Sequence, residues 1–334
     1  MHIVLDAFGG DNAPLAPIQG AALATADGMQ ITLVGNEEII RRVAAENKVS
    51  LDGIAIVHTE DVIAMEDEPR SILKAHKECS MAVGLRLVAD GHGDAFVSAG
   101  STGALIMGAT FFVKRIKGVP RAAIATLIPT ASGKPSLLLD SGANADCRPE
   151  MLCQFAQMGS VYMTRVMGDG KPATVGLVNI GTEECKGGEL QQEAYRLIKE
   201  SGVNFVGNVE SREVPFGAAD VLVTDGFTGN ILLKAIEGTA GMLMKEIKAL
   251  FMSNLLTKIA ALLVKSKIGV LKSRMSTSEH GGAPVLGVCR PVIKAHGNSN
   301  AAAIRSACRI AGEFASTGVI EAIAASAKES KDDE

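Results

Sequence analysis

The stretch IVLDAFGGD, residues 3–11, shows the pattern that decides the fold. A short run of apolar residues passes directly into a loop that carries two glycines between acids. The same order, an apolar run closed by Gly, Asn, Asp or Ser, recurs along the chain. Short runs of Val, Ile and Leu bounded by turn formers are typical of strands buried on both faces of a sheet.

These runs alternate with segments that have helical spacing. The predicted strands are Ile3–Ala7, Ile31–Val34, Ile54–Val57, Ala95–Val97, Ile124–Ile128, Leu137–Leu139, Val175–Ile180, Phe205–Val206, Val221–Thr224 and Val292–Ala295. The predicted helices are Glu37–Asn47, Ser71–Ala89, Ala104–Lys114, Pro149–Met167, Glu189–Glu200 and Ile231–Leu250. The alternation indicates an α/β architecture with a largely parallel sheet.

Length and composition limit the class of protein. The chain has 334 residues and a mass of 34.7 kDa, and 47% of its residues are hydrophobic, which excludes global disorder. No linker is evident, so we expect one α/β domain over residues 1–327 and a charged tail at 328–334. A net charge of -4 and a pI of about 5.9 argue against nucleic acid as a partner.

Targeting and metal signals are weak. Residues 1–40 contain no Lys or Arg, and no window holds about 18 uninterrupted apolar residues, so we expect a cytoplasmic protein without a spanning helix. The six cysteines form no CxxC pair and the six histidines form no HExxH pattern. We therefore expect free thiols, no metal site and no cofactor.

Polar and glycine-rich clusters follow the carboxyl ends of the predicted strands. They are Asp6–Asp11, Ser98–Ala104, Asp140–Asn144, Asn179–Glu184, Gly207–Glu210 and Asp225–Asn230. Ligands of open α/β sheets bind at carboxyl ends, because loops and helix starts converge there. We therefore predict one pocket that these ends build together.

Two of the clusters have the features of an anion site. Gly100 and Gly103 allow a tight turn in which Thr102 caps the next helix, and Gly226 and Gly229 do the same around a capping Thr228. Unpaired N–H groups at a helix start favour phosphate, and Lys186 and Lys234 could add positive charge. The alternative is a pair of ordinary capped loops. The GxGxxG and GxxxxGK[ST] patterns and a GxSxG elbow are absent, which argues against NAD, ATP and a serine nucleophile.

Other polar residues allow more than one interpretation. Asp6 and Asp11 flank Gly9 and Gly10, where they could order a turn, hold a basic side chain or bind a metal, and turn formation is favoured. His280 and His296 lie in loop sequences and could donate to a substrate oxygen or serve as structural hydrogen-bonding groups. Cys147 and Cys153 are better read as buried apolar residues than as nucleophiles.

A basic amphipathic segment covers residues 247–278. It contains no Asp or Glu, and Leu255, Leu256, Ile259, Leu262 and Leu263 fall on one helical stripe flanked by lysines. Gly269 is expected to interrupt the helix. Such a segment suits an anionic membrane surface, a homodimer interface or packing as a helical hairpin.

In this order the clusters resemble one family, the bacterial acyl carrier protein:phosphate acyltransferases of phospholipid synthesis. The matching stretches are DAFGGDNAP at 6–14, SAGSTGA at 98–104, LDSGAN at 139–144, MGSVY at 158–162, NIGTEECKG at 179–187, FVGNVE at 205–210, DGFTGN at 225–230 and HGGAPVLG at 280–287. Phe8, Ser101 and His280 depart from the family pattern, in which we expect Met, Asn and Tyr. A Tyr-like position does not require the imidazole of His280.

The resemblance implies a three-layer αβα sandwich, similar to isopropylmalate dehydrogenases and phosphotransacetylases. It also implies transfer of an acyl group from acyl carrier protein to inorganic phosphate, giving an acyl phosphate that a membrane glycerol-3-phosphate acyltransferase consumes. A homodimer and peripheral membrane association are further implications. Phosphate is the nucleophile in this reaction, so no Ser or Cys nucleophile is needed.

On this basis we assign catalytic roles to Lys186, in phosphate or oxyanion electrostatics, and to Asn230, in binding phosphate or the carbonyl oxygen. The expected substrate and phosphate contacts are Asp6, Gly9, Gly10, Ser98, Gly100, Ser101, Thr102, Gly103, Asn144, Asn208, Asp225, Thr228, Gly229, Lys234 and His296. The expected membrane contacts are Leu255, Leu256, Ile259, Leu262 and Leu263. The alternatives are a phosphotransacetylase-like enzyme that uses acyl coenzyme A, a dehydrogenase of similar fold, and a non-catalytic membrane scaffold.

Overall fold

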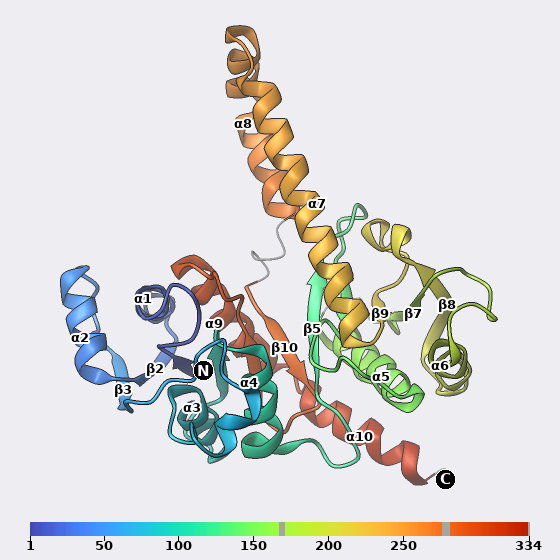
Figure 1. Ribbon diagram of the computed structural model, residues 1–334, viewed down its shortest axis with the longest axis horizontal. Coiled ribbons are helices and arrows are strands. Elements are labelled where there is room, and N and C mark those ends of the chain that lie inside the picture. Colours follow the sequence, from blue (N-terminus) through green and yellow to red (C-terminus); the bar gives the residue numbers. More distant parts are fainter. Residues whose placement is uncertain (167–170, 276–280, 333–334) are drawn as a thin grey trace.

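The computed structural model describes residues 1–166, 171–275 and 281–332, which form one eleven-stranded sheet with helices on both faces (Figure 1). The strands are β1 (His2–Asp6), β2 (Gln30–Gly35), β3 (Ile54–His58), β4 (Ala95–Ser98), β5 (Ala123–Ile128), β6 (Ser136–Leu139), β7 (Thr174–Asn179), β8 (Asn204–Glu210), β9 (Val221–Val223), β10 (Ala283–Leu286) and β11 (Val292–Lys294). The predicted α/β class with a mostly parallel sheet is confirmed.

The helices account for most of the remaining chain. They are α1 (Leu15–Ala26), α2 (Glu37–Glu46), α3 (Ser80–Ala89), α4 (Thr102–Gly108), α5 (Pro149–Val166), α6 (Glu189–Glu200), α7 (Gly226–Met252), α8 (Leu255–Met275), α9 (Ala301–Ser316) and α10 (Val319–Asp332). Two short 3-10 turns, η1 (Pro69–Leu73) and η3 (Ser211–Phe216), and a π-helical turn, η2 (Ala109–Lys114), complete the structure.

Strand order divides the sheet into two parallel blocks. The order is β3-β2-β1-β4-β11-β10-β5-β6-β9-β7-β8. The first block, β3 to β11, and the second block, β6 to β8, are each parallel, but β10 and β5 join them through antiparallel pairings. The two blocks therefore run in opposite directions, and their carboxyl ends lie at opposite edges. The expectation that all six polar clusters gather at one edge is wrong for this reason.

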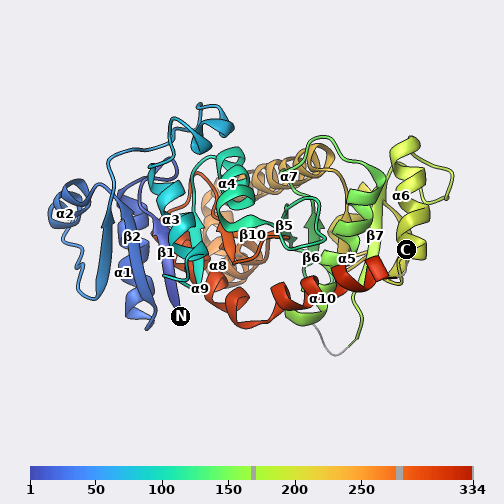
Figure 2. The ribbon, with the colours of Figure 1, turned by 90° about the horizontal axis from the view of Figure 1, so that it is seen from below.

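Alternation along each strand separates the two helical layers. Ile3 and Leu5 of β1 pack into the core beneath α1, α5 and α9, whereas Val4 packs into the core beneath α3 and α4. In the second block Leu138 faces the core beneath α7. Figure 2 shows α4 and α7 on one side of the strands and α9 and α10 on the other. The three-layer arrangement is the one that the family resemblance implies.

The helix predictions differ from the structure in three places. The stretch Ser71–Ala89 is not one helix but η1 and α3, separated by a turn in which His76 Nδ1 lies 2.9 Å from Asp61. Helix α8 continues through Gly269, since a glycine inside a helix costs only about 1 kcal/mol. Helix α10, which was not predicted, extends past residue 327 to Asp332.

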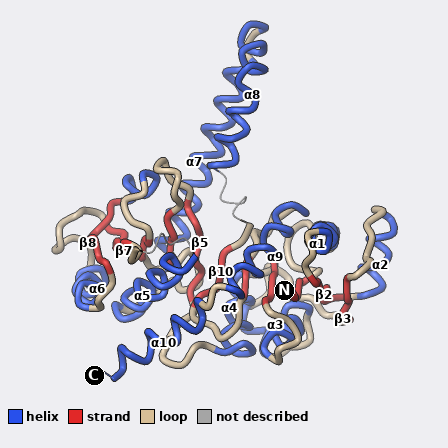
Figure 3. The backbone as a smooth tube through the Cα atoms, turned by 180° about the vertical axis from the view of Figure 1, so that it is seen from behind, coloured by secondary structure: helices blue, strands red, loops and turns tan. Residues whose placement is uncertain are grey.

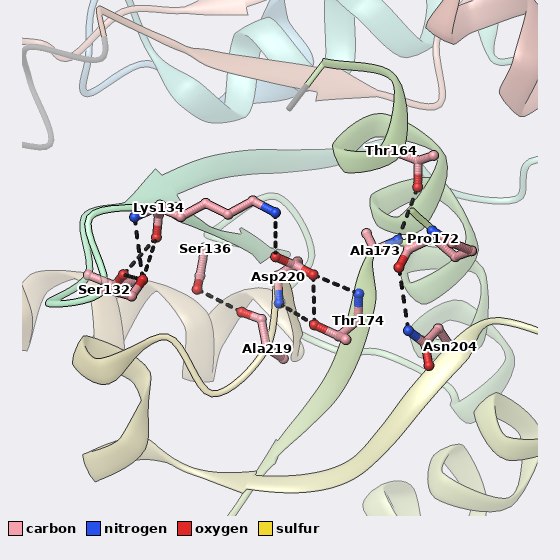
Figure 4. Close-up of polar contacts among 11 residues, drawn as sticks. Ser132, Lys134, Ser136, Thr164, Pro172, Ala173, Thr174, Asn204, Ala219 and Asp220 are labelled. Atoms are coloured by element: carbon pink, nitrogen blue, oxygen red, sulfur yellow. Dashed lines mark hydrogen bonds and ion pairs between the residues drawn. The ribbon is translucent and has the colours of Figure 1, made fainter. Parts of the chain in front are cut away.

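The amino ends of the second block are held by Asp220 (Figure 4). Its carboxylate accepts hydrogen bonds from the backbone N–H and the hydroxyl of Thr174, both at 2.8 Å, and pairs with Lys134 Nζ at 3.3 Å. Burial alone would raise the pKa of Asp220, but the Thr174 hydrogen bonds and the Lys134 ammonium hold it below its ordinary value. The Gly133–Ser136 stretch, which superficially resembles a P-loop, is therefore a hairpin turn whose lysine already has a partner.

Helices α7 and α8 form a hairpin that projects from the body (Figures 1 and 3). They join at Asn254, whose side chain accepts from the Thr257 N–H at 3.0 Å. The apolar stripe predicted here is bare, with Leu255 74%, Leu256 80%, Ile259 50%, Leu262 72% and Leu263 81% exposed. Within the described ranges, no helix is both long enough and apolar enough to cross a membrane.

Candidate active site

An open cleft of about 360 Å³ lies between the two blocks. It extends from Thr102 and Lys294, at the carboxyl edge of the first block, across Ile124 and Thr126 of β5 to residues that follow β6. The other lining residues are Asp11, Met65, Leu127, Ser141, Gly142, Asn230, Leu233, Lys234, Glu237, Gly281, Gly282, Ala283, Ala295, His296, Gly297 and Ser299. The central strands β6 and β10 have only four residues each, so residues that follow the carboxyl ends of both blocks reach the same cleft.

Behind the first wall, Asp6 braces two loops. Its buried carboxylate accepts from the hydroxyls of Ser80 and Ser98, each at 2.7 Å, and from the Phe8 N–H at 3.1 Å. Burial raises the pKa of Asp6. Asp6 therefore orders the turn, which is the favoured one of the three roles considered from sequence, and Asp6 and Ser98 do not line the cleft.

The two glycines after Asp6 are required by close approach. A Cβ on Gly9 would lie 2.6 Å from the Asp6 carboxylate and 2.7 Å from the Gly100 nitrogen. Gly10 has φ +99°, and the Asp11 N–H donates to the Gly297 carbonyl at 2.8 Å. Gly9, Gly10 and Gly100 bring the loops after β1, β4 and β11 together but lie outside the cleft lining, whereas Asp11 and Gly297 line it.

Behind the second wall, Asp140 has the same bracing role. It accepts from the N–H groups of Ile124 at 3.0 Å, Gly142 at 3.1 Å and Asn144 at 2.7 Å. Burial raises the pKa of Asp140 despite these bonds. The Asn144 amide donates to Asp140 and to the Ala122 carbonyl, both at 2.8 Å, so Asn144 supports the turn and does not face the cleft.

The carboxylate of Asp225 already occupies the start of α7. Asp225 is the N-cap, and its carboxylate accepts from the Thr228 N–H and hydroxyl, both at 2.8 Å. The prediction that Thr228 caps this helix is wrong, because Asp at the preceding cap position supplies a stronger acceptor. A Cβ on Gly229 would lie 2.0 Å from the Asp140 carbonyl, so this glycine lets α7 pack directly against the Asp140 turn.

The start of α4 differs from that of α7. Ser101 is the N-cap and makes no side-chain capping bond, and Thr102 is the first helical residue rather than the predicted cap. Thr102 lines the cleft. A Cβ added at Gly103 would lie 2.6 Å from the Pro69 ring, so this position requires glycine. The first N–H groups of a helix have no intrahelical acceptor, so the α4 end of the cleft is the better position for an anion.

Three basic side chains line the cleft. Lys234 Nζ lies 2.7 Å from Glu237 and 3.3 Å from Nε2 of His296. Lys294 Nζ donates to the carbonyls of Ala99, at 3.3 Å, and Ala295. Sequence reasoning missed Lys294, although a charged residue inside the otherwise apolar run Val292–Ala295 was an available signal.

On the second wall, Asn230 is the uncharged polar side chain that α7 contributes. Its Nδ2 is 3.4 Å from the Ser141 carbonyl, a long contact that leaves the amide available to a ligand. Leu233 lies one turn further along α7 and lines the cleft with Met65 and Leu127, so part of the wall is apolar.

Lys186 and Asn208 are placed away from this lining. Lys186 is exposed on the loop after β7, and its carbonyl accepts from Asn179 Nδ2 at 3.1 Å. Asn208 Nδ2 donates to the Glu183 carbonyl at 2.8 Å, so Asn208 and Asn179 shape the loop that carries Lys186. His280 lies outside the described residues.

Among the described residues, a thiolate nucleophile would require a cysteine of low pKa, and a metal site would require several ligand side chains close together. Burial raises the pKa of Cys147 to about 12, which disfavours a thiolate nucleophile. Across residues 1–166, 171–275 and 281–332, no three His, Cys, Asp or Glu side chains gather in a metal-binding arrangement.

Comparison with solved structures defines the fold class. A phosphotransacetylase from Streptococcus pyogenes superimposes with a TM-score of 0.64 over 94% of both chains, at 15% sequence identity. The fold is thus that of the phosphotransacetylases. Similarity to isopropylmalate dehydrogenases remains a prediction.

Sequence comparison then defines the family. The family model described as "Fatty acid synthesis protein" matches residues 1–322. The chain is 45% identical to a phosphate acyltransferase from Acetivibrio thermocellus over 325 residues, covering 97% of this chain and 95% of that protein. It is 47% identical to one from Lysinibacillus sphaericus over 325 residues, covering 97% of each chain. The chain therefore belongs to this family of fatty acid synthesis proteins and is an enzyme of the phosphate acyltransferase group.

Proposed function

We propose that the enzyme transfers an acyl group from the thioester of acyl carrier protein to inorganic phosphate. A phosphate oxygen attacks the thioester carbonyl, the tetrahedral intermediate collapses, and the C–S bond breaks to give an acyl phosphate and the carrier thiol. The observation that carries this proposal is the cleft itself, which combines basic side chains and an open helix start at one end with an apolar wall and Asn230.

We assign the anion to the end of the cleft formed by Thr102, Lys234 and His296. The N–H groups at the α4 start and the two basic side chains would offset the repulsion between two anionic reactants. Holding both reactants in position can contribute about 7–11 kcal/mol to lowering the barrier. The acyl chain would lie against Met65, Leu127 and Leu233.

Asn230 is proposed to donate to the oxyanion that develops on the thioester carbonyl. Loss of one such donor typically costs about 10²–10³ in rate. Lys186 is proposed to act electrostatically. Because it lies outside the cleft lining, kinetics rather than contact geometry must establish its role.

The decisive assay traps acyl phosphate with hydroxylamine and measures the hydroxamate. We expect product with acyl carrier protein thioester and phosphate, a loss of at least about 100-fold in Asn230→Ala, and a smaller loss in Lys186→Ala, with folding checked by circular dichroism. Wild-type rates in both folded variants would reject the assigned roles. Equal use of acyl coenzyme A would favour a phosphotransacetylase-like function, whereas no hydroxamate with either donor would favour a scaffold.

We further propose that the α7–α8 hairpin mediates homodimerisation, contact with an anionic membrane surface, or both. Five exposed apolar side chains on one helix stripe, flanked by Lys258 and Lys265, support this proposal. Membrane contact would place a cytoplasmic enzyme beside the membrane glycerol-3-phosphate acyltransferase that consumes its greasy product.

Vesicle binding tests the hairpin directly. Leu255→Glu combined with Ile259→Glu should release the protein from anionic vesicles while the cleft remains intact. Light scattering on the same variant reports whether the dimer is lost as well, and retention of both vesicle binding and the dimer would reject the proposal.

A further inference from the structure

Lys294 is held in the cleft by the strand that carries it. It is the last residue of β11 and pairs in register with Ser98, the last residue of β4. Its ammonium donates to the carbonyls of Ala99 and Ala295, the residues that directly follow those two strands. The side chain is therefore directed toward the loop that leads from Ser98 into α4, at the end of the cleft where Thr102 lies.

This ammonium has no paired carboxylate among the residues that the structure describes. The contrast with Lys234 is direct, because Lys234 is half exposed and forms an ion pair with Glu237 at 2.7 Å. Lys294 is partly buried, and both acidic side chains, Asp11 and Glu237, and the basic side chain of Lys234 line the same cleft.

Burial lowers the pKa of Lys294 to about 8. Asp11 from the loop after β1 opposes this shift, Lys234 from α7 adds to it, and Asp6 opposes it by a smaller amount. His296, two residues along the chain, lines the same cleft. The pKa falls because burial and Lys234 together outweigh the two carboxylates.

A desolvated cation without a counter-ion costs stability unless a ligand supplies the missing charge. The ligand must be an anion, and it must reach the cleft beside the α4 start. We propose that Lys294 is the principal side chain that binds the incoming phosphate, and that Lys234 has a secondary part because Glu237 already neutralises it. This assignment rests on the proposed function, which supplies phosphate as a substrate.

The same arrangement makes phosphate affinity depend on pH. Only the protonated lysine binds the anion, so the apparent affinity falls with the protonated fraction. Inorganic phosphate is expected to be largely a dianion above pH ~7.5, by analogy with the second pKa of ~6 for phosphomonoesters. Arginine stays charged throughout this range, so Lys294→Arg removes the titration but keeps the charge.

Calorimetric titration of the full-length protein with inorganic phosphate, without an acyl donor, tests the assignment. At about pH 7.5 we expect Lys294→Met to weaken binding by at least tenfold and Lys234→Met by less. We expect Lys294→Arg to stay within a few-fold of wild type. Lys117→Met, an exposed lysine outside the cleft, serves as the matched control. Wild-type affinity should fall about tenfold or more between pH ~7.5 and ~9.5, whereas that of Lys294→Arg should stay nearly constant.

The outcomes separate this assignment from the proposed function. If wild type binds phosphate and Lys294→Met binds it equally well, the assignment is wrong and the proposed function stands. If Lys234→Met is the more damaging change, the two lysines are assigned in the wrong order. If wild type binds no phosphate at all, the assignment and the proposed phosphate site both fail. Lys294→Arg keeps the test valid if Lys294→Met does not fold.

Discussion

One aspartate supports each edge of the second strand block, and the pKa values of the two aspartates are shifted in opposite directions. Asp140, at the carboxyl edge, is completely buried and receives mainly backbone N–H groups, and its pKa is raised. Asp220, at the amino edge, is partly exposed beside Lys134, and its pKa is lowered. Burial thus disfavours the charged form of the aspartate at the edge that forms the cleft, whereas the Thr174 hydrogen bonds and Lys134 favour the charged form of the aspartate at the opposite edge.

The difference shows that carboxyl groups with raised pKa values are buried beside the cleft and not at the opposite edge of the second block. Asp140 shapes the turn that lines the cleft and contacts α7, and Asp6 does the same for the first block, also with a raised pKa. A neutral residue at either position could not accept so many N–H and O–H groups at once. The loops at the cleft therefore depend on two carboxyl groups whose pKa values burial raises, and perturbed pKa values are common at functional sites.

The largest expected effect comes from Asp140→Asn. The amide NH₂ would face N–H donors of Gly142 and Asn144, leaving buried donors unpaired, so we expect a loss of about 3 kcal/mol in the free energy of unfolding. Because the turn lines the cleft, hydroxamate formation should fall at least tenfold. Urea unfolding measures the first quantity. A variant as stable and active as wild type would show that the Asp140 carboxylate does not brace the turn.

Asp220→Asn should have an intermediate effect that depends on pH. The folded pKa lies below the unfolded value, so the stabilisation is present above pH ~4 and is lost as pH falls through the folded pKa. We expect a loss of about 1–2 kcal/mol at pH 7 that disappears once the pH is below the folded pKa of Asp220, with little change in activity. A pH-independent difference in unfolding free energy would contradict this sign.

Lys134→Met should have the smallest effect. The Lys134 side chain is 47% exposed, and surface ion pairs contribute about 0–1 kcal/mol. Combining it with Asp220→Asn in a double-mutant cycle gives the coupling energy between the two residues. A coupling above about 2 kcal/mol would mean that the ion pair, rather than the Thr174 hydrogen bonds, holds the amino edge.

The sequence was informative where local pattern decides structure. Each predicted strand was found, because short apolar runs closed by turn formers need no distant information. Strand β10 was missed, since Ala283–Leu286 is short and contains Pro284. The second block is reversed by the antiparallel pairing of β5 with β6, and strand direction is set by tertiary pairing that no local pattern encodes.

The site was predictable only in part for the same reason. Thr102, Asn230, Lys234 and His296 were predicted and do meet in the cleft. Four other predicted binding residues lie outside the cleft lining and hydrogen-bond to neighbouring groups, so their binding role stays a prediction; they are Asp6, Ser98, Asn144 and Asp225. Whether a polar residue after a strand faces ligand or loop depends on packing that the sequence does not display.

Helix α7 has a geometric consequence that follows from its length. Its 27 residues form one rod of about 40 Å that carries Asn230 and Lys234 near one end and the turn into α8, at the tip of the hairpin, at the other. Each residue of an α-helix adds about 100° of rotation, so inserting a single amino acid midway would swing the hairpin stripe a quarter-turn or more while the cleft kept its shape. The number of residues in α7 therefore sets the orientation of the cleft relative to the surface that the apolar stripe contacts.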